Sequence, residues 1–151
     1  MKVYLDVCCL NRLFDNQEQA RIALEAAAVI KVLDLIDSLV LSDCSSEMAK
    51  VEIERMPDAD RRRGVLALLP PDERIMPLSQ PLLDSADEFV ALGFQLADAV
   101  HLAAAKRLAA DVLLTVDDKF LRRAKRYAGR LGCRVLNPMT FVEELGDAID
   151  G

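Results

Sequence analysis

Four acidic residues of this chain stand beside apolar residues that are expected to be buried: Asp6, Glu52, Asp98 and Asp117. An ionised carboxylate that is buried without a partner costs free energy or shifts its pKa instead. Four such positions call for one shared explanation, and a bound cation is the usual one. These residues are therefore the best guide to function in the sequence.

The chemistry that suits these carboxylates is that of a hard divalent cation. Carboxylate oxygens without Cys or His ligands select ions such as Mg²⁺ or Mn²⁺. Such ions bind phosphate oxygens, acidify a bound water and stabilise charge on a leaving oxygen, and phosphodiester hydrolysis is the reaction that most often needs this. Thr115 precedes Asp117 by two residues and can support a carboxylate or a metal-bound water by hydrogen bonding.

Each of the four acids also has a structural explanation that needs no ion. Asp6 can cap the segment that follows it, and Asp117 or its neighbour Asp118 can cap the next helix. Asp98 can be an acid favoured in the first turn of a helix by the helix dipole. Glu52 can be one of several exposed helix acids. Taken jointly, the four positions favour a metal site.

The remaining side chains that could do chemistry give weaker signals. His101 follows Asp98 by three residues and shares its helix face, where a role as metal ligand or base is open. A hydrogen-bonded core histidine is the commoner case and is expected here. The four cysteines show no zinc spacing and are expected to be small buried thiols in a reducing compartment. The chain has no glycine-rich phosphate-binding loop, and the pair Ser45-Ser46 has no base partner to make it nucleophilic.

Length and composition predict one domain, residues 1–151, with a substantial core, since 52% of the residues are hydrophobic. The apolar runs are far shorter than the ~20 residues that span a bilayer. The first predicted strand begins at Lys2 and leaves no room for a signal peptide. We therefore expect a cytoplasmic protein with no membrane partner. The net charge of −6 argues against a general nucleic-acid coat protein, but it is compatible with a nuclease whose basic groups are local.

One local group of basic residues follows Asp117 directly on a predicted helix. A solvated helix face is the commoner reason for such a group. Its place beside Asp117 also suits contact with the phosphate backbone of RNA. The residues concerned are Arg122, Arg123, Lys125 and Arg126.

Short apolar runs alternate with longer helical patterns along the chain. Strands are predicted at residues 3–5, 39–41, 74–78, 112–115 and 134–136. Helices are predicted at 17–37, from Ser45 or Ser46 to about 56, and at 60–69, 81–92, 96–108, 119–131 and from 138 onward. This alternation predicts an α/β fold, a three-layer α/β/α sandwich with a central parallel sheet of four to five short strands. Ligands of such sheets bind beyond the carboxyl ends of the strands, where Asp6 and Asp117 fall.

The combination of these motifs resembles the PIN-domain family of ribonucleases, which includes VapC-type toxins. The resemblance runs from about residue 2 to residue 141. The matching pieces are Val3-Tyr4-Leu5-Asp6, the stretch Ser-Glu-Met-Ala-Lys-Val-Glu from Ser46 to Glu52, Asp98-Ala-Val-His-Leu-Ala, and Leu113-Leu114-Thr115-Val116-Asp117 with Phe120. The last two pieces, taken together at their separation in the chain, are the most specific part of the resemblance.

The resemblance implies an α/β/α sandwich with Mg²⁺- or Mn²⁺-dependent phosphodiesterase activity on single-stranded RNA, and frequent dimerisation. In toxin members of the family a cognate antitoxin inserts across the site. The resemblance maps Asp6, Glu52, Asp98 and Asp117 onto the acidic metal-site positions of the family, and Thr115 onto its accessory hydroxyl.

The chain departs from the family pattern immediately after the first acid. Many relatives carry Thr or Ser there, whereas this chain has Val7, and the missing hydroxyl is expected to weaken support for the ion. Asn11 is the candidate for supplying a polar group near the site instead. The resemblance also decides two choices that spacing leaves open, namely Glu52 over Glu47 and Asp117 over Asp118.

The first hypothesis for function is a metal-dependent endoribonuclease that hydrolyses phosphodiester bonds of single-stranded or structured RNA, as the toxin of a toxin–antitoxin pair or outside one. The alternative is a catalytically weak or inactive module of the same fold that binds RNA or a protein partner. Val7 and the acidic net charge support this alternative. A phosphotransfer receiver domain is disfavoured, because it needs a Lys at the end of a late strand, where this chain has Leu136-Asn137-Pro138. The RNA target, the number of ions, the antitoxin and the oligomeric state stay open.

Overall fold

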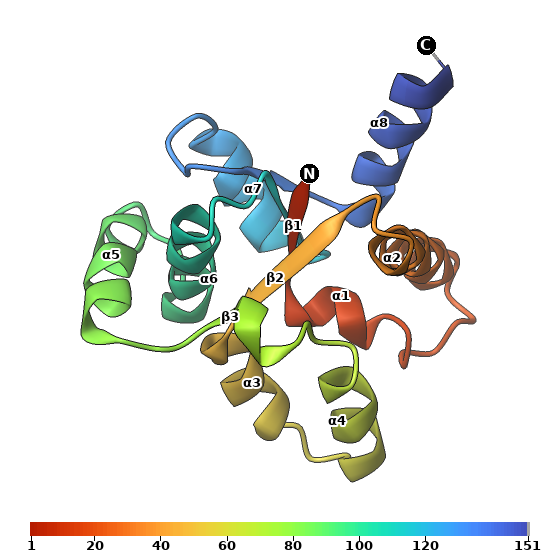
Figure 1. Ribbon diagram of the computed structural model, residues 1–151, viewed down its shortest axis with the longest axis horizontal. Coiled ribbons are helices and arrows are strands. Elements are labelled where there is room, and N and C mark those ends of the chain that lie inside the picture. The colour runs from red at the N-terminus through yellow and green to blue at the C-terminus, as the bar shows by residue number, and fades with distance from the viewer. Residues whose placement is uncertain (151) are drawn as a thin grey trace.

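A parallel sheet of five short strands forms the centre of the computed structural model, which describes residues 1–150 (Figure 1). Its strand order is β3-β2-β1-β4-β5, and every neighbouring pair is parallel. The first strand in sequence, β1, is therefore the central strand of the sheet. The strands are β1 (Lys2–Leu5), β2 (Ser42–Ser46), β3 (Ile75–Met76), β4 (Val112–Leu114) and β5 (Arg134–Leu136).

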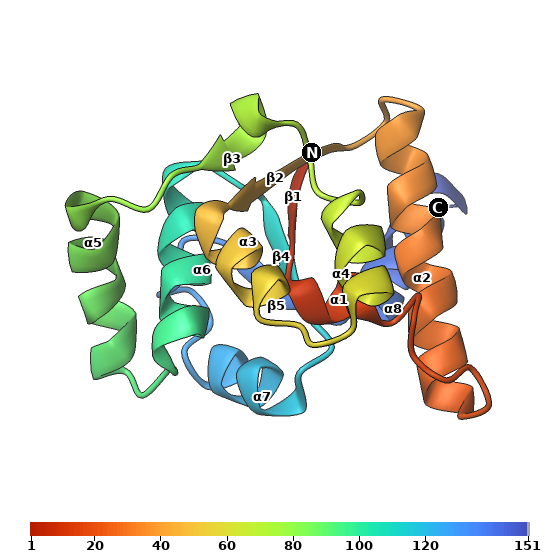
Figure 2. The ribbon, with the colours of Figure 1, turned by 90° about the horizontal axis from the view of Figure 1, so that it is seen from below.

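Helices cover both faces of this sheet, as Figures 1 and 2 show. The helices α5, α6 and α7 pack on one face, and α1 to α4 together with α8 pack on the other. The predicted three-layer α/β/α fold is thus confirmed. The helices are α1 (Val7–Asn11), α2 (Ala20–Asp37), α3 (Glu47–Glu54), α4 (Ala59–Leu66), α5 (Gln80–Ala91), α6 (Leu96–Arg107), α7 (Asp118–Arg126) and α8 (Pro138–Asp150), with a 3₁₀ turn at Asp72–Arg74.

The two central strands divide their side chains between the two cores with the period of two that a strand imposes. On β1, Val3 and Leu5 enter the core beneath α2, whereas Tyr4 between them enters the core beneath α6. On β4, Val112 and Leu114 likewise face the first core and Leu113 faces the second. Because both faces of these strands are buried, they read in the sequence as continuous apolar runs.

The second strand lies later in the chain than predicted. The sequence favours 39–41 because of its apolar residues, but these residues form the turn that follows the end of α2 at Asp37. Leu39 has a left-handed backbone (φ 63°) and is exposed, and the backbone N–H groups of Val40 and Leu41 both bond the carbonyl of Leu35. The strand itself, Ser42–Ser46, is polar in sequence yet largely buried.

Other differences from the predicted elements are smaller. The short helix α1 was not predicted, and it begins directly after Asp6. The predicted helix 119–131 ends at Arg126, because the chain turns through Gly129 and Gly132, which both have positive φ. The predicted helix 60–69 begins and ends earlier, as α4, whose first turn is capped by the Asp58 carboxylate.

The order of the strands fixes where a ligand site is to be sought. From β1 the chain winds outward through β2 to β3, and it then returns to place β4 on the opposite side of β1. The boundary between β1 and β4 is thus the switch point, where open parallel sheets bind ligands beyond the carboxyl ends of their strands. Asp6 follows β1 directly, and Asp117 follows β4 after two residues.

In the described part of the chain, no single helix has both the length and the hydropathy to cross a membrane. The helices α5 and α6 reach these values only when counted together, and they are bent by 117° relative to each other.

Candidate metal centre

The Asp6 carboxylate is buried at the end of β1 and is held by two side chains. The Thr115 hydroxyl donates to its Oδ2 at 2.8 Å, and the Cys8 thiol donates to the same oxygen at 3.3 Å. Asp6 occupies the N-cap position of α1 but makes no side-chain capping bond. Its carboxylate therefore does not serve as a helix cap, and its other oxygen, Oδ1, faces α6.

Glu52 comes from α3 and meets the imidazole of His101 on α6. Its Oε1 is in hydrogen-bond contact with His101 Nε2, and the same nitrogen lies 3.8 Å from Asp6 Oδ1. One ligand atom from each of Asp6, Glu52 and His101 lies within 4.8 Å of the others. Glu52 thus turns inward and is not one of the solvated helix acids.

Asp98 lies in the first turn of α6, half-buried, within the electrostatic field of the same group. Its pKa is raised to about 7, first by burial and next by the negative charge of Asp6. Nearby His101 opposes this shift, and the carboxylates of Asp117 and Glu52 add to it. The four predicted acids therefore repel one another, which is the electrostatic condition that a bound cation relieves.

The pair Asp117 and Asp118 divides between two roles. Asp117 caps α7, since its Oδ1 accepts the backbone N–H groups of Lys119 and Phe120 at 2.9 and 3.2 Å. Both bonds end on Oδ1, so Oδ2 is not committed to them. Asp118 instead receives both terminal nitrogens of Arg21 at 2.7 and 2.8 Å, and this contact lowers its pKa. Thr115 links Asp117 to the buried end of the site, because its hydroxyl also accepts the backbone N–H of Asp117.

The donor set fits a divalent cation. It offers carboxylate oxygens from four separate segments and one imidazole nitrogen. Carboxylate-rich sets of this kind bind Mg²⁺ and Mn²⁺. The acids that would hold the ion are Asp6 and Glu52, whose oxygens lie close together beside His101. Neither the half-buried Asp98 nor the exposed Asp117 contributes an atom to this close group, although both act on it electrostatically.

Two contributors to this site were not singled out from the sequence as site residues: Cys8 and His101. Val7 is buried and offers no hydroxyl, as expected, but Cys8 follows it and its thiol bonds Asp6, lies 3.2 Å from Thr115 Oγ1 and accepts the backbone N–H of Val116. The expected loss of support at Val7 is therefore offset by the next residue. The side-chain Oδ1 of Asn11 is buried and has no hydrogen-bond partner among the described residues, so its predicted role near the site stays a prediction.

The raised pKa of Asp98 predicts how the stability of the metal-free protein depends on pH. The folded chain holds the Asp98 proton more tightly than the unfolded chain, so the free energy of unfolding is expected to fall as pH rises from about 4 to about 7. Asp98→Asn removes this loss. Since Asp98 is partly exposed, we expect the variant to be more stable than the wild type by about 1 to 2 kcal/mol at pH values above 7.

Urea unfolding in EDTA, followed by circular dichroism on both proteins at acidic and alkaline pH, measures this effect. The pKa of His101 is also raised, because its bond to Glu52 and the charge of Asp6 outweigh the lowering caused by burial. Its titration therefore changes stability in the same direction, and the relevant quantity is the difference between variant and wild type at each pH. If the difference in unfolding free energy between Asp98→Asn and the wild type were the same at acidic and alkaline pH, the prediction would be wrong.

The predicted RNA-contacting residues lie on the exposed side of α7, next to the acids. Arg122, Arg123, Lys125 and Arg126 are all exposed. The Arg123 guanidinium reaches back to the Leu92 carbonyl between α5 and α6, and Arg126 lies over the Tyr127 ring at 5.9 Å. The cations therefore extend from the acidic rim along one helix.

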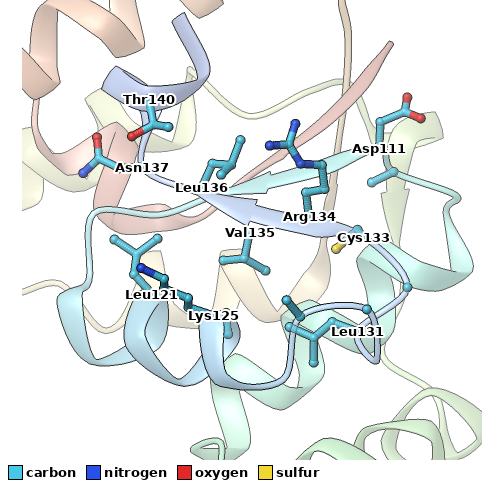
Figure 3. Close-up of a pocket in the computed structure, with 15 residues that line it drawn as sticks. Asp111, Leu121, Lys125, Leu131, Cys133, Arg134, Val135, Leu136, Asn137 and Thr140 are labelled. Carbon is cyan, nitrogen blue, oxygen red and sulfur yellow. The ribbon is translucent and has the colours of Figure 1, made fainter. Parts of the chain in front are cut away.

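A cavity of about 840 Å³ lies between α7 and the edge strand β5, and it reaches Lys125 at one end of the basic group (Figure 3). Lys125, Cys133, Arg134 and Val135 are among the residues that line it. None of the four predicted acids does so. The cavity is thus separate from the acidic site.

Comparisons with known proteins agree with this architecture. The family model described as PIN domain matches residues 3–126. The solved structure of VapBC2 from Rickettsia felis, bound to a DNA fragment from its promoter, contains a chain that is similar to this one with a TM-score of 0.58. The two chains are 13% identical, and the match covers 91% of this chain and 98% of that chain, so the likeness concerns the fold. Among curated proteins, no sequence matches the chain.

Proposed function

Since the chain belongs to the PIN domain family, we propose that it is a divalent-metal-dependent endoribonuclease. PIN domains are generally nucleases, and the substrate and metal are the parts of the proposal that concern this chain. The observation that carries it is the meeting of Asp6, Glu52 and His101 at the switch point of the sheet, with Asp98 within the electrostatic field of this group. Acids that repel one another in a partly buried site lower the stability of the fold, so their presence is better explained by a function than by folding alone.

The side chains of the site have separate parts in this proposal. A divalent ion, when bound, would supply charge for the phosphate oxygens and an acidified water for in-line attack. Thr115 and Cys8 hold Asp6 in one orientation through its Oδ2. His101 holds Glu52. Asp98 is neutral when it is protonated, which would limit repulsion in the metal-free protein, and its ionised form would be the one that binds an ion.

The polymer would reach the acids along α7. We propose that Arg122, Arg123, Lys125 and Arg126 bind phosphates of single-stranded or structured RNA and hold the RNA backbone beside Asp117. Because the protein as a whole carries a net charge of −6, this local attraction has to act against a repulsive average field. A cognate antitoxin and a second copy of the chain are the proposed protein partners, and the Rickettsia felis VapBC2 complex is the precedent for the first.

The test of the proposed function is RNA cleavage under metal control. Tag-free protein is incubated with single-stranded RNA in Mn²⁺, in Mg²⁺ and in EDTA, and with DNA of the same sequence. We expect internal cleavage of RNA in the presence of metal and none in EDTA. Metal-independent cleavage would contradict the proposal, and RNA binding without cleavage in either ion would favour the inactive module instead.

Removal of two cations from α7 is expected to weaken RNA binding without damaging the chemistry. Arg122→Ala combined with Lys125→Ala should raise KM by about 5- to 20-fold and leave kcat within about twofold. The slope of the logarithm of the binding constant against the logarithm of salt concentration should decrease by the equivalent of about two phosphate contacts. The matched control removes two exposed cations elsewhere, Lys31→Ala with Arg63→Ala. A kcat loss in the α7 variant, or an equal KM effect in the control, would show that α7 is not the phosphate-binding helix.

A further inference from the structure

Both ring nitrogens of the buried His101 are in hydrogen-bond contact with other side chains. His101 lies on α6 with no exposed surface. Its Nδ1 is 2.6 Å from the Tyr4 hydroxyl, which is in turn 2.7 Å from the Ser46 hydroxyl. The Tyr4 ring packs edge-on against the imidazole at 5.5 Å between centroids. These contacts fix the ring so that Nε2 points out of the core and toward the acids.

His101 Nε2 and Asp6 Oδ1 have the spacing of two ligands that share one ion, whereas Glu52 Oε1 is in direct hydrogen-bond contact with Nε2. Nε2 contacts Glu52 Oε1 and lies 3.8 Å from Asp6 Oδ1. Two ligand atoms that are each about 2.1 Å from one ion lie roughly 3 to 4 Å apart. The Glu52 side chain is about one-third exposed and can turn away from the imidazole to admit an ion between them.

We propose that His101 Nε2 is a direct ligand of the divalent ion, together with Asp6 and Glu52, and that the site therefore prefers a transition-metal ion over Mg²⁺. This inference rests on the proposed function, because it deepens the account of the same site. An imidazole nitrogen favours ions such as Mn²⁺, Co²⁺ or Zn²⁺, whereas an all-oxygen set suits Mg²⁺. The family's acidic positions account for the oxygen ligands only.

The partners on the other side of the ring are those that a metal-bound histidine requires. Metal-ligating histidines usually donate the second ring N–H to a fixed acceptor, which orients the ring and keeps the ligating nitrogen unprotonated. The Tyr4 hydroxyl can accept this proton at Nδ1 and pass its own hydrogen to Ser46. In the metal-free protein the same hydroxyl can donate to Nδ1 while Nε2–H bonds Glu52. The Tyr4–Ser46 pair can therefore hydrogen-bond His101 in both the metal-bound and the metal-free protein, and no buried polar group of these three side chains is left without a partner.

The experiment reads the ligand directly by pulsed electron paramagnetic resonance of Mn²⁺ bound to the protein. His101 is the only histidine in the sequence, so in tag-free protein any imidazole coupling to Mn²⁺ belongs to it. We expect a nitrogen coupling that changes when the histidine is isotopically labelled. In His101→Gln this coupling should vanish, and the preference for Mn²⁺ over Mg²⁺, measured by competition, should fall at least about tenfold.

The outcomes separate this inference from the proposed function. Mn²⁺ that binds and supports RNA cleavage, but shows no imidazole coupling, would overturn the inference and leave the nuclease standing, with His101 as a hydrogen-bond partner of Glu52 alone. Failure of the wild-type protein to bind any divalent ion would overturn both. The wild-type spectrum with and without labelled histidine decides the question, so the test does not depend on the folding of His101→Gln. Tyr4→Phe provides a further check, since it should weaken Mn²⁺ binding while retaining the nitrogen coupling.

Discussion

Asp6→Asn is expected to reduce metal-dependent RNA cleavage by at least about 10³-fold, because it removes a central charged oxygen ligand and with it several kcal/mol of transition-state stabilisation. Asp6 is the acid that touches most of the site. One oxygen receives Thr115 and Cys8, and the other faces His101 at 3.8 Å. The measurement is the rate of cleavage of a fluorescent single-stranded RNA under saturating Mn²⁺.

The fold is expected to survive this change. An amide can still accept the Thr115 hydroxyl, and the variant loses a negative charge from a group of mutually repelling acids, so the metal-free Tm should be equal to or above that of the wild type. The added stability that Mn²⁺ gives to the wild type should be lost. The matched control is Asp43→Asn, which changes another buried aspartate, paired with Arg74 near the amino end of β2. Asp43→Asn should lower stability and retain cleavage. If pure Asp6→Asn cleaved RNA as fast as the wild type, the proposed site would be wrong.

Glu25→Ala is expected to give the largest loss of stability among the charged residues of the described chain, about 3 kcal/mol. Glu25 lies on α2 with no exposed surface, and its carboxylate accepts Arg12 at 3.0 Å, Arg21 at 3.4 Å and the Asn137 amide at 2.6 Å. Truncation leaves these donors around a cavity. Arg12 and Arg21 are partly exposed and can be hydrated, which keeps the loss below the upper end of the range for buried pairs.

Urea unfolding in EDTA measures this loss. The control is Glu88→Ala, which removes a carboxylate from the exposed pair with Lys106 and should cost less than about 1 kcal/mol. Glu25→Gln keeps the side-chain volume and one acceptor oxygen, but its NH2 group replaces the second acceptor. Its loss of stability should therefore fall between those of Glu25→Ala and Glu88→Ala. Equal losses in Glu25→Ala and Glu88→Ala would show that the buried contacts contribute no more than surface ones.

The sequence was sufficient for the elements that are defined by their own residues. The strands β1 and β4 are buried on both faces and so appear as apolar runs, and the long helix α2 shows its period directly. The strand β2 was misplaced because its burial depends on distant partners. Asp43 is neutralised by Arg74, and Ser46 bonds Tyr4, 42 residues earlier. Helix α1 has five residues, too few to show a period.

The same distinction applies to the site. The acids could be singled out because each interrupts an apolar pattern, and their residue types alone indicate a hard cation. The role of Cys8 could not be seen, because its contacts to Thr115 and Val116 join residues more than 100 positions apart. His101 was expected to be a hydrogen-bonded core histidine, and its bond to Tyr4 agrees with that. Its second face, toward Asp6 and Glu52, follows only from the packing of α3 and α6 beside β1.

The central position of β1 has a consequence for the time at which this site comes into existence. Asp6 is held by the hydroxyl of Thr115, which follows it by 109 residues, and β1 gains its second neighbour only when β4 has been made. Contacts so distant along the chain form late in folding. The acidic centre of a nascent chain is therefore not assembled until β4 and Thr115 have been synthesised, and the activity proposed for it is expected only after that point.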